Sequence, residues 1–144
     1  MTEIAPVVVE IRVDAVPERA FTLFTAHIGA WWPIAINSVY DGTVVFEGDE
    51  LVERSGDRVA VWAEVTRWDP PSALALSWHP GRNASDATDV RIAFIRDGDG
   101  TLVRLTHSGW ERLLDGGERS EQYARGWPLV LDRLAESSRG AELA

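Results

Sequence analysis

The sequence predicts an α+β fold in which a curved antiparallel sheet of about six to seven strands wraps around a long C-terminal helix. Three observations support this prediction. Residues 7–13 alternate like a half-buried strand, turn sequences divide residues 41–108 into short strand-like segments, and residues 118–136 carry one apolar helical stripe. A curved sheet with one apolar face must cover that face, and the last helix is the available cover. We find no repeat or linker, so residues 1–144 are expected to form a single domain.

The composition narrows the classes of function. The chain has 144 residues, 45% of them hydrophobic, and a net charge of −9. Such an acidic chain repels phosphate backbones and anionic membrane surfaces, so we expect no nucleic-acid partner and no membrane insertion. The absence of cysteine excludes disulfides and thiolate metal sites, and a cytoplasmic location is the default expectation. Seven tryptophans exceed what a small core needs, so some of them should line a cavity or groove.

The first strand and the first helix are read directly from the pattern. Alternate residues from Val7 to Val13 share one face, which makes this strand half-buried. Pro17 then marks the start of a helix, where the missing N–H of proline costs no hydrogen bond. The helix carries an apolar stripe, and short helices are expected before Pro33. Trp31 and Trp32 are adjacent and are not expected to be buried on one face together, so one of them should either point at the cavity entrance or form a hydrophobic cap on the surface. The stripe consists of Ala20, Phe21, Phe24 and Ile28.

The turns predict which strand residues face each other. A two-residue turn within residues 97–100 places Val90 opposite His107. The loop at 69–72 places Ala63 opposite Trp78, and the loop at 79–87 is interpreted as placing Trp78 opposite Val90. Together these pairings predict an inward apolar face that includes Leu76, Trp78, Val90, Ile92, Phe94 and His107. The opposite face is predicted to carry Trp62, His79, Asp89 and Ser108, with Asp89 and His79 as a candidate pair.

This register decides how His107 is interpreted. Adjacent strand residues point to opposite faces, so His107 and Ser108 are not a nucleophile–base pair. His79 is predicted on the other face from His107, which counts against a shared metal, and we expect neither a metal nor a cofactor. His107 either fixes the polar end of a ligand inside an apolar pocket or bonds a nearby group and anchors the strand end.

The last helix carries the stripe that should face the sheet. Pro128 lies inside this pattern and predicts a kink or a helix restart. Gly126 suggests a close approach of helix to sheet, or room for a ligand. Trp110, just after the last strand, is either a loop anchor or a lid. The chain ends, including residues 138–144, are expected to be frayed. The stripe consists of Tyr123, Trp127, Val130, Leu131 and Leu134.

The order of several short motifs resembles a known superfamily. "VPERAFTLFT", "GAWWP", "VTRWDPPSALALSW", "GTLVRLTHSGW" and "GWPLVLDRL" follow one another over about residues 4–136. In this order and spacing they resemble the START-like helix-grip superfamily (SRPBCC). Within it, the chain is most similar to the bacterial branch named after the activator of the heat shock protein 90 ATPase.

The resemblance implies a sheet gripping the C-terminal helix and a deep, mostly apolar cavity between the two. Members of the superfamily bind lipids, polyketides, hormones or other hydrophobic molecules, and a minority catalyse cyclisation, dehydration or hydrolysis. The eukaryotic chaperone activator has an additional domain before its helix-grip domain. Here the first strand starts near residue 7, which argues against chaperone activation.

We therefore expect a small hydrophobic ligand to bind between the sheet and the C-terminal helix. Whether the chain is an enzyme stays open: a cavity enzyme of the cyclase, dehydratase or hydrolase kind would use His107 with a second polar group from Tyr123 or Tyr40. A partner-binding module of the chaperone-activator type is a third alternative, and a homodimer is also left open. The residues expected to line the cavity are Trp32, Leu76, Trp78, Val90, Ile92, Phe94, His107, Tyr123 and Trp127.

Overall fold

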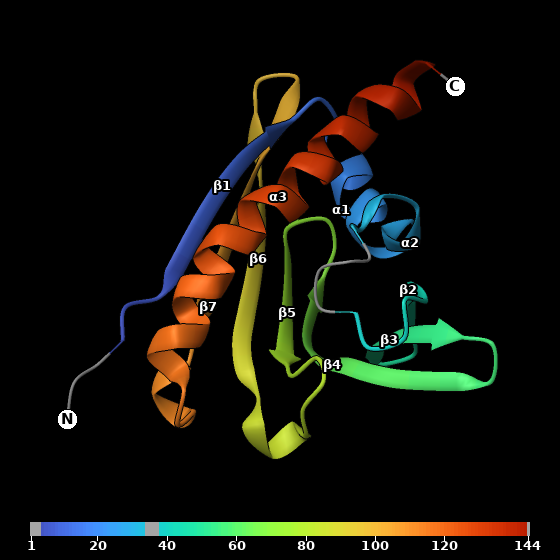
Figure 1. Ribbon diagram of the computed structural model, residues 1–144. Helices are drawn as coiled ribbons and strands as arrows, with labels where there is room; N and C mark the ends of the chain where they lie inside the picture. The colour runs from blue at the N-terminus through green and yellow to red at the C-terminus, as the bar shows by residue number, and fades with distance from the viewer. Residues whose placement is uncertain (1–3, 34–37, 144) are drawn as a thin grey trace.

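A seven-stranded antiparallel sheet covered by a long C-terminal helix forms the architecture of the chain (Figure 1). The computed structural model describes residues 4–33 and 38–143, with side chains as far as Arg139. None of the described helices is both long enough and apolar enough to cross a membrane. In chain order the elements are β1 (Val7–Val13), α1 (Pro17–Thr25), α2 (Ile28–Trp31), β2 (Thr43–Glu47), β3 (Glu50–Ser55), β4 (Arg58–Asp69), β5 (Ala73–Trp78), η1 (Ala84–Asp86), β6 (Thr88–Asp97), β7 (Gly100–Ser108), η2 (Trp110–Arg112) and α3 (Gly116–Leu143).

The strands follow one another across the sheet, apart from β1. Their spatial order is β1-β7-β6-β5-β4-β3-β2, so β2 to β7 form a meander and β1 pairs antiparallel with the last strand. Figure 1 shows α3 running diagonally across one face of this sheet, with α1 and α2 on the same side at one end. The predicted α+β fold, with its curved sheet and C-terminal helix, is therefore confirmed.

The N-terminal elements form as their sequence predicts. The inward residues of β1 are the less exposed ones along the strand. Pro17 starts α1, and the whole predicted stripe is buried, although its last member, Ile28, lies in α2. Both Trp31 and Trp32 are buried in the same core, so the prediction that they could not be buried on one face together was wrong. α2 ends between the two residues, and Trp32 leaves it with extended backbone, so adjacent rings both turn inward.

The predicted pairing holds for two of the three hairpins. Val90 lies opposite His107, and Ala63 lies opposite Trp78. Between β5 and β6 the prediction was wrong by two residues, because Trp78 pairs with Thr88 and not with Val90. The long connection contains η1, and β6 begins only at Thr88. A two-residue shift preserves the faces of a strand, so the inward direction of His107 survives the correction.

The predicted outer face was wrong at Trp62, which is buried and packs against Trp32 and Trp78. β4 contains two bulges. In the pairing with β3, Leu51 lies opposite Ala63 and Val52 opposite Val61, which leaves Trp62 as the extra residue. In the pairing with β5, Thr66 is the extra residue. A bulge re-aims the side chains on its strand, which explains why Trp62 joins the core beside Ala63.

α3 is one element from Gly116 to Leu143, and Pro128 lies inside it without a restart. The predicted fraying was wrong for residues 138–143, which are helical, whereas residues 1–3 and 144 lie outside the described part of the chain. A Cβ built on Gly126 would meet nothing within 4 Å, so a close approach to the sheet is not the reason for this glycine. The alternative, room beside the helix, is left open. Trp127, Val130, Leu131 and Leu134 are buried as the stripe predicts.

Candidate functional site

The space between the sheet and α3 holds a continuous set of packed rings, which we call the aromatic cluster. It joins α2, the inner face of the sheet, η2 and α3. Neighbouring ring centroids lie 5.4 Å apart for Trp32 and Trp62, 5.2 Å for Trp78 and Trp127, and 4.8 Å for His107 and Tyr123. Such distances are those of favourable offset and edge-to-face contacts. The members of the cluster are Trp32, Trp62, Trp78, His107, Trp110, Tyr123 and Trp127.

His107 lies at the centre of the polar contacts of this cluster. Its side chain is fully buried, and both ring nitrogens have partners. The Trp127 Nε1–H donates to Nδ1 at 3.0 Å, and Nε2 lies 2.6 Å from Thr88 Oγ1. An indole N–H can only donate, so Nδ1 must be the unprotonated nitrogen. Nε2 therefore carries the proton and donates it to Thr88, whose hydroxyl lies 3.4 Å from the Trp78 carbonyl oxygen.

The environment of His107 keeps the imidazole neutral. Burial lowers its pKa to about 3, because an apolar surrounding disfavours the charged form. A general base needs a lone pair that can reach a substrate proton, and the only lone pair of this ring is occupied by Trp127. The arrangement fits the alternative in which His107 anchors the strand end.

Two further aromatic side chains enclose the same ring. Trp110 lies against His107 with its centroid 4.0 Å away, and its Nε1–H donates to the His107 carbonyl oxygen at 3.0 Å. Trp110 is almost completely buried, which fits the loop anchor. Gly109 allows the chain to turn so that Trp110 folds back over His107, since its φ of 89° belongs to the left-handed region that glycine tolerates. On α3, Tyr123 Oη accepts a hydrogen bond of 3.0 Å from Trp78 Nε1, and burial raises the pKa of this phenol.

The structure brings together five of the nine predicted cavity residues, namely Trp32, Trp78, His107, Tyr123 and Trp127. Leu76, Val90 and Ile92 are buried on the inner face of the sheet. Phe94 packs against Phe21 and Phe24 of α1, near the opposite end of the core. Tyr40 does not join the cluster, since its ring lies beneath Arg58.

A narrow crevice reaches the aromatic cluster from the surface. It has a volume of about 20 Å³ and is bordered by Trp78, Thr88, Trp110 and Tyr123 among other residues. This volume is room for about one water molecule. The cluster therefore fills its own space in this structure, and the crevice marks the place where the rings lie nearest to solvent.

The contacts of several polar residues near the site were not predicted from the sequence. Thr88 was missed because the register of β6 was wrong by two residues. His79 was expected to pair with Asp89, but its Nε2 lies 2.8 Å from a carboxylate oxygen of Glu64, whereas Asp89 pairs with Arg112 at 2.8 Å. In the described part of the chain, no three histidine, aspartate or glutamate side chains are grouped so that they could hold a metal ion.

Glu53 on β3 is the most unexpected functional candidate. Its side chain is fully buried, and its carboxylate accepts hydrogen bonds from the backbone N–H groups of Val39, Tyr40 and Gly42 at 2.7 to 3.0 Å. The Ser38 hydroxyl also donates to it, and Trp62 Nε1 lies 3.3 Å away. Burial alone would raise the pKa of Glu53, but these hydrogen bonds outweigh it and hold the pKa below its usual value. This carboxylate ties residues 38–42 to the sheet beside the aromatic cluster.

Comparison with known proteins places this geometry in a family. The profile of the family described as "Activator of Hsp90 ATPase homolog 1-like protein" matches residues 14–138. No curated protein matches the chain. Among solved structures, the Aha1 dimer from Colwellia psychrerythraea has a TM-score of 0.69 at 18% identity, covering 93% of this chain and 96% of that one.

Two other similar structures widen the comparison. CalU16 from Micromonospora echinospora has a TM-score of 0.62 at 21% identity, covering 94% of this chain and 74% of its own. A protein described as the anthrahydroquino-gama-pyrone synthase Txn09 complexed with SUM has a TM-score of 0.59 at 25% identity, covering 94% of this chain and 99% of its own. The family profile spans most of the chain, and the sheet and helix have the predicted helix-grip arrangement. The chain therefore belongs to the activator of Hsp90 ATPase homolog 1-like family of the helix-grip superfamily.

Proposed function

We propose that the chain binds a small hydrophobic molecule, most favourably an aromatic one, at the aromatic cluster between the sheet and α3. The observation that carries this proposal is the crevice, which leads from the surface to Trp78, Trp110 and Tyr123. In this proposal the rings occupy the ligand's place in the free protein and rearrange when it enters. Planar side chains suit such a site, because they exchange ring-to-ring contacts for contacts with a planar ligand.

The polar groups of the cluster would orient the ligand. Tyr123 Oη and Thr88 Oγ1 are the hydroxyls at the crevice, and a ligand oxygen could replace the Trp78 indole as the partner of Tyr123. The similarity to a synthase solved in a complex, at 25% identity over 94% of this chain, also supports a ligand in this family. We do not propose catalysis by His107, because both of its nitrogens are occupied and no carboxylate of the described residues bonds it.

Binding is tested best with the Trp68→Phe variant. This change removes the indole N–H signal of the half-exposed tryptophan, which lies outside the aromatic cluster. We would titrate this variant with a fatty acid, a sterol and an anthraquinone, and follow the indole N–H resonances. The resonance of Trp127 Nε1–H should shift saturably with at least one of these ligands, since it bonds His107 inside the cluster.

A matched control is Leu129→Ala on α3, whose side chain is 58% exposed and points away from the core. It should bind as the parent does, whereas Tyr123→Phe should weaken the binding of an oxygen-bearing ligand. If no member of the panel moves the Trp127 resonance at saturating concentration, the aromatic cluster is a packed core and the proposal fails.

A further inference from the structure

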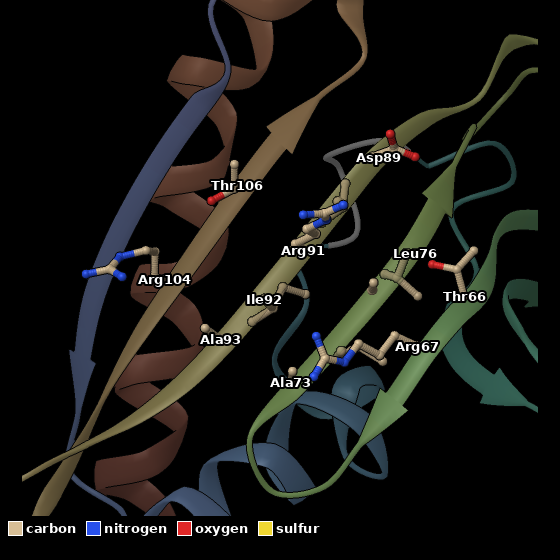
Figure 2. A pocket seen from close by; sticks show the side chains of 13 residues that line it. Thr66, Arg67, Ala73, Leu76, Asp89, Arg91, Ile92, Ala93, Arg104 and Thr106 are labelled. Atoms are coloured by element: carbon tan, nitrogen blue, oxygen red, sulfur yellow. The ribbon is translucent and has the colours of Figure 1, made fainter.

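A wide hollow lies on the face of the sheet that α3 does not cover (Figure 2). Its volume is about 540 Å³, within the range of small-molecule sites. The side chains of Ala73, Ala75 and Ala93 point to this face and form its floor. We call it the outer hollow. Four further residues of β5 and β6 border it, although they are buried: Leu74, Leu76, Val90 and Ile92.

The strand register places arginines around this alanine floor. Arg67, Ala75, Arg91 and Thr106 lie opposite one another across four strands, in that order. In the next row Ala73 pairs with Ala93, and Ala93 pairs with Arg104. The bulge at Thr66 leaves two consecutive residues, Thr66 and Arg67, lining the same hollow. In Figure 2 the side chain of Arg67 extends from β4 toward Ala73, and Arg91 stands near the middle of the hollow.

Among the three arginines that line the outer hollow, Arg91 alone has no ion-pair partner in the described part of the chain. Arg104 bonds Glu10 at 2.6 Å, and Arg67 bonds Asp69 at 3.1 Å. Asp89, the acidic residue that lines the hollow, is paired with Arg112. The Arg91 guanidinium makes no ion pair or hydrogen bond with the residues that the structure describes. The Arg91 guanidinium therefore stands open above small apolar side chains and offers a bidentate site for a carboxylate.

We propose that the outer hollow binds a small aromatic anion, with its ring on the alanine floor and its carboxylate or sulfonate on Arg91. Arg67 lies in the same row, on the other side of Ala75, and could supply a second guanidinium. Its exposed pair with Asp69 contributes little stability that an incoming anion must overcome. A planar ring suits a flat floor of alanines and can also stack on a guanidinium plane. This site lies on the opposite face of the sheet from the aromatic cluster and goes beyond the proposed function.

Two other occupants fit the outer hollow less well. β4 to β7 are inner strands with both edges paired, so an extended peptide cannot add to them as a further strand. A second copy of the chain packed about a two-fold axis through the hollow would bring the two Arg91 side chains together, and like charges at that distance oppose association. A small anion meets neither obstacle.

The test uses 2-naphthoate, with its neutral counterpart 2-naphthamide, titrated into the full chain and followed through backbone amide resonances. We expect saturable shifts at Ala73, Ala75 and Ala93, and binding of the amide at least about tenfold weaker, because it cannot form the charge-assisted pair. Arg91→Gln should weaken 2-naphthoate by about tenfold or more. Ala75→Phe, which fills the floor, should abolish the shifts.

Arg96→Gln is the matched control, because Arg96 is an exposed arginine of the same strand that does not line the hollow. It should leave the affinity for 2-naphthoate within about twofold. Absence of saturable binding, equal binding of the neutral amide, or an equal loss in the two arginine variants would overturn the proposal. Shifts confined to the indole N–H of Trp127 would also overturn it, since they would place the ligand in the aromatic cluster instead.

Discussion

At the scale of single residues, the contacts of His107 show how a histidine can be conspicuous in the sequence without being reactive. The Trp127 indole determines which nitrogen of His107 is protonated. The Thr88 hydroxyl accepts the hydrogen bond from the protonated nitrogen, and Trp110 covers the imidazole ring. Each partner comes from a different element, so the imidazole links β6, β7, η2 and α3. Its expected contribution is therefore to the stability and the uniqueness of this packing.

The neutral imidazole makes stability depend on pH in a defined direction. The unfolded chain binds a proton at His107 near pH 6.5, whereas the folded chain does so only near pH 3, because burial lowers the pKa to about 3. Between these values the unfolded state holds the extra proton, so stability falls as the pH is lowered. We expect this group to cost about 2 kcal/mol between pH 7 and pH 5.

Urea unfolding of the wild type and of His107→Gln, at pH 7, 6 and 5, would measure this dependence. The variant cannot titrate at this position, so its unfolding free energy should fall less over the same interval, whatever its absolute stability. Parallel pH curves for the two proteins would show that His107 is protonated in the folded state as readily as in the unfolded one.

Glu53 is a second residue whose role depends on its partners. Glu53→Gln replaces one acceptor oxygen with an amide NH2 that faces backbone donors, so one or two of the three backbone N–H groups lose their bond. We expect a loss of about 3 kcal/mol in the free energy of unfolding. Glu50→Gln, on the exposed end of the same strand, should stay within about 0.5 kcal/mol of the wild type. Similar losses in both variants would contradict this role of the Glu53 carboxylate.

At the scale of elements, the turns and caps could be predicted from sequence and the bulges could not. The "DG" turn at Gly98, the start of α1 at Pro17 and the face of His107 follow from local rules. The bulges of β4 leave no mark in the sequence, because an inserted residue looks like any other member of an alternating strand. Trp62 was consequently assigned to the outer face, although it completes the aromatic cluster. Thr66 was assigned no role, although it lines the outer hollow.

The same limit explains the remainder of the candidate site. The five cavity residues that meet in the cluster were predicted because aromatic side chains on inward faces must pack somewhere. Glu53 could not be found, since it stands in "LVERS" like an ordinary exposed strand residue and its partners lie on a segment with no regular structure. Its burial follows from tertiary contacts alone.

The junction between η2 and α3 provides a prediction at this scale. A Cβ on Gly116 would lie 1.9 Å from the carbonyl oxygen of Trp110, whereas a Cβ on Gly117 would meet nothing within 4 Å. Gly116→Ala should therefore destabilise the protein by more than about 1 kcal/mol. Gly117→Ala should be neutral or stabilising by up to about 1 kcal/mol, because alanine favours a helix. Chemical denaturation of the two neighbouring variants would compare them directly, and equal effects would contradict the close approach at Gly116.

At the scale of the whole molecule, six of the seven tryptophans are buried, each at most 6% exposed, while Trp68 is 50% exposed. Quenching by acrylamide should therefore reach mainly Trp68 in the native protein. Trp68→Phe should remove most of the quenchable emission, and unfolding in urea should restore quenching to the remaining rings. If Trp68→Phe were still quenched strongly under native conditions, the aromatic cluster would be open to small molecules in solution.

The position of β1 has a consequence for the order in which the fold can be completed during synthesis. Every hairpin from β2 to β7 joins strands that are neighbours in sequence. β1 pairs only with β7, so Val7 cannot pair until His107 has been synthesised. On the ribosome the first strand therefore emerges without a partner and stays unpaired until the seventh has been made. Its pairing and the docking of α3 are long-range events, and they set the slowest, most exposed stage of folding.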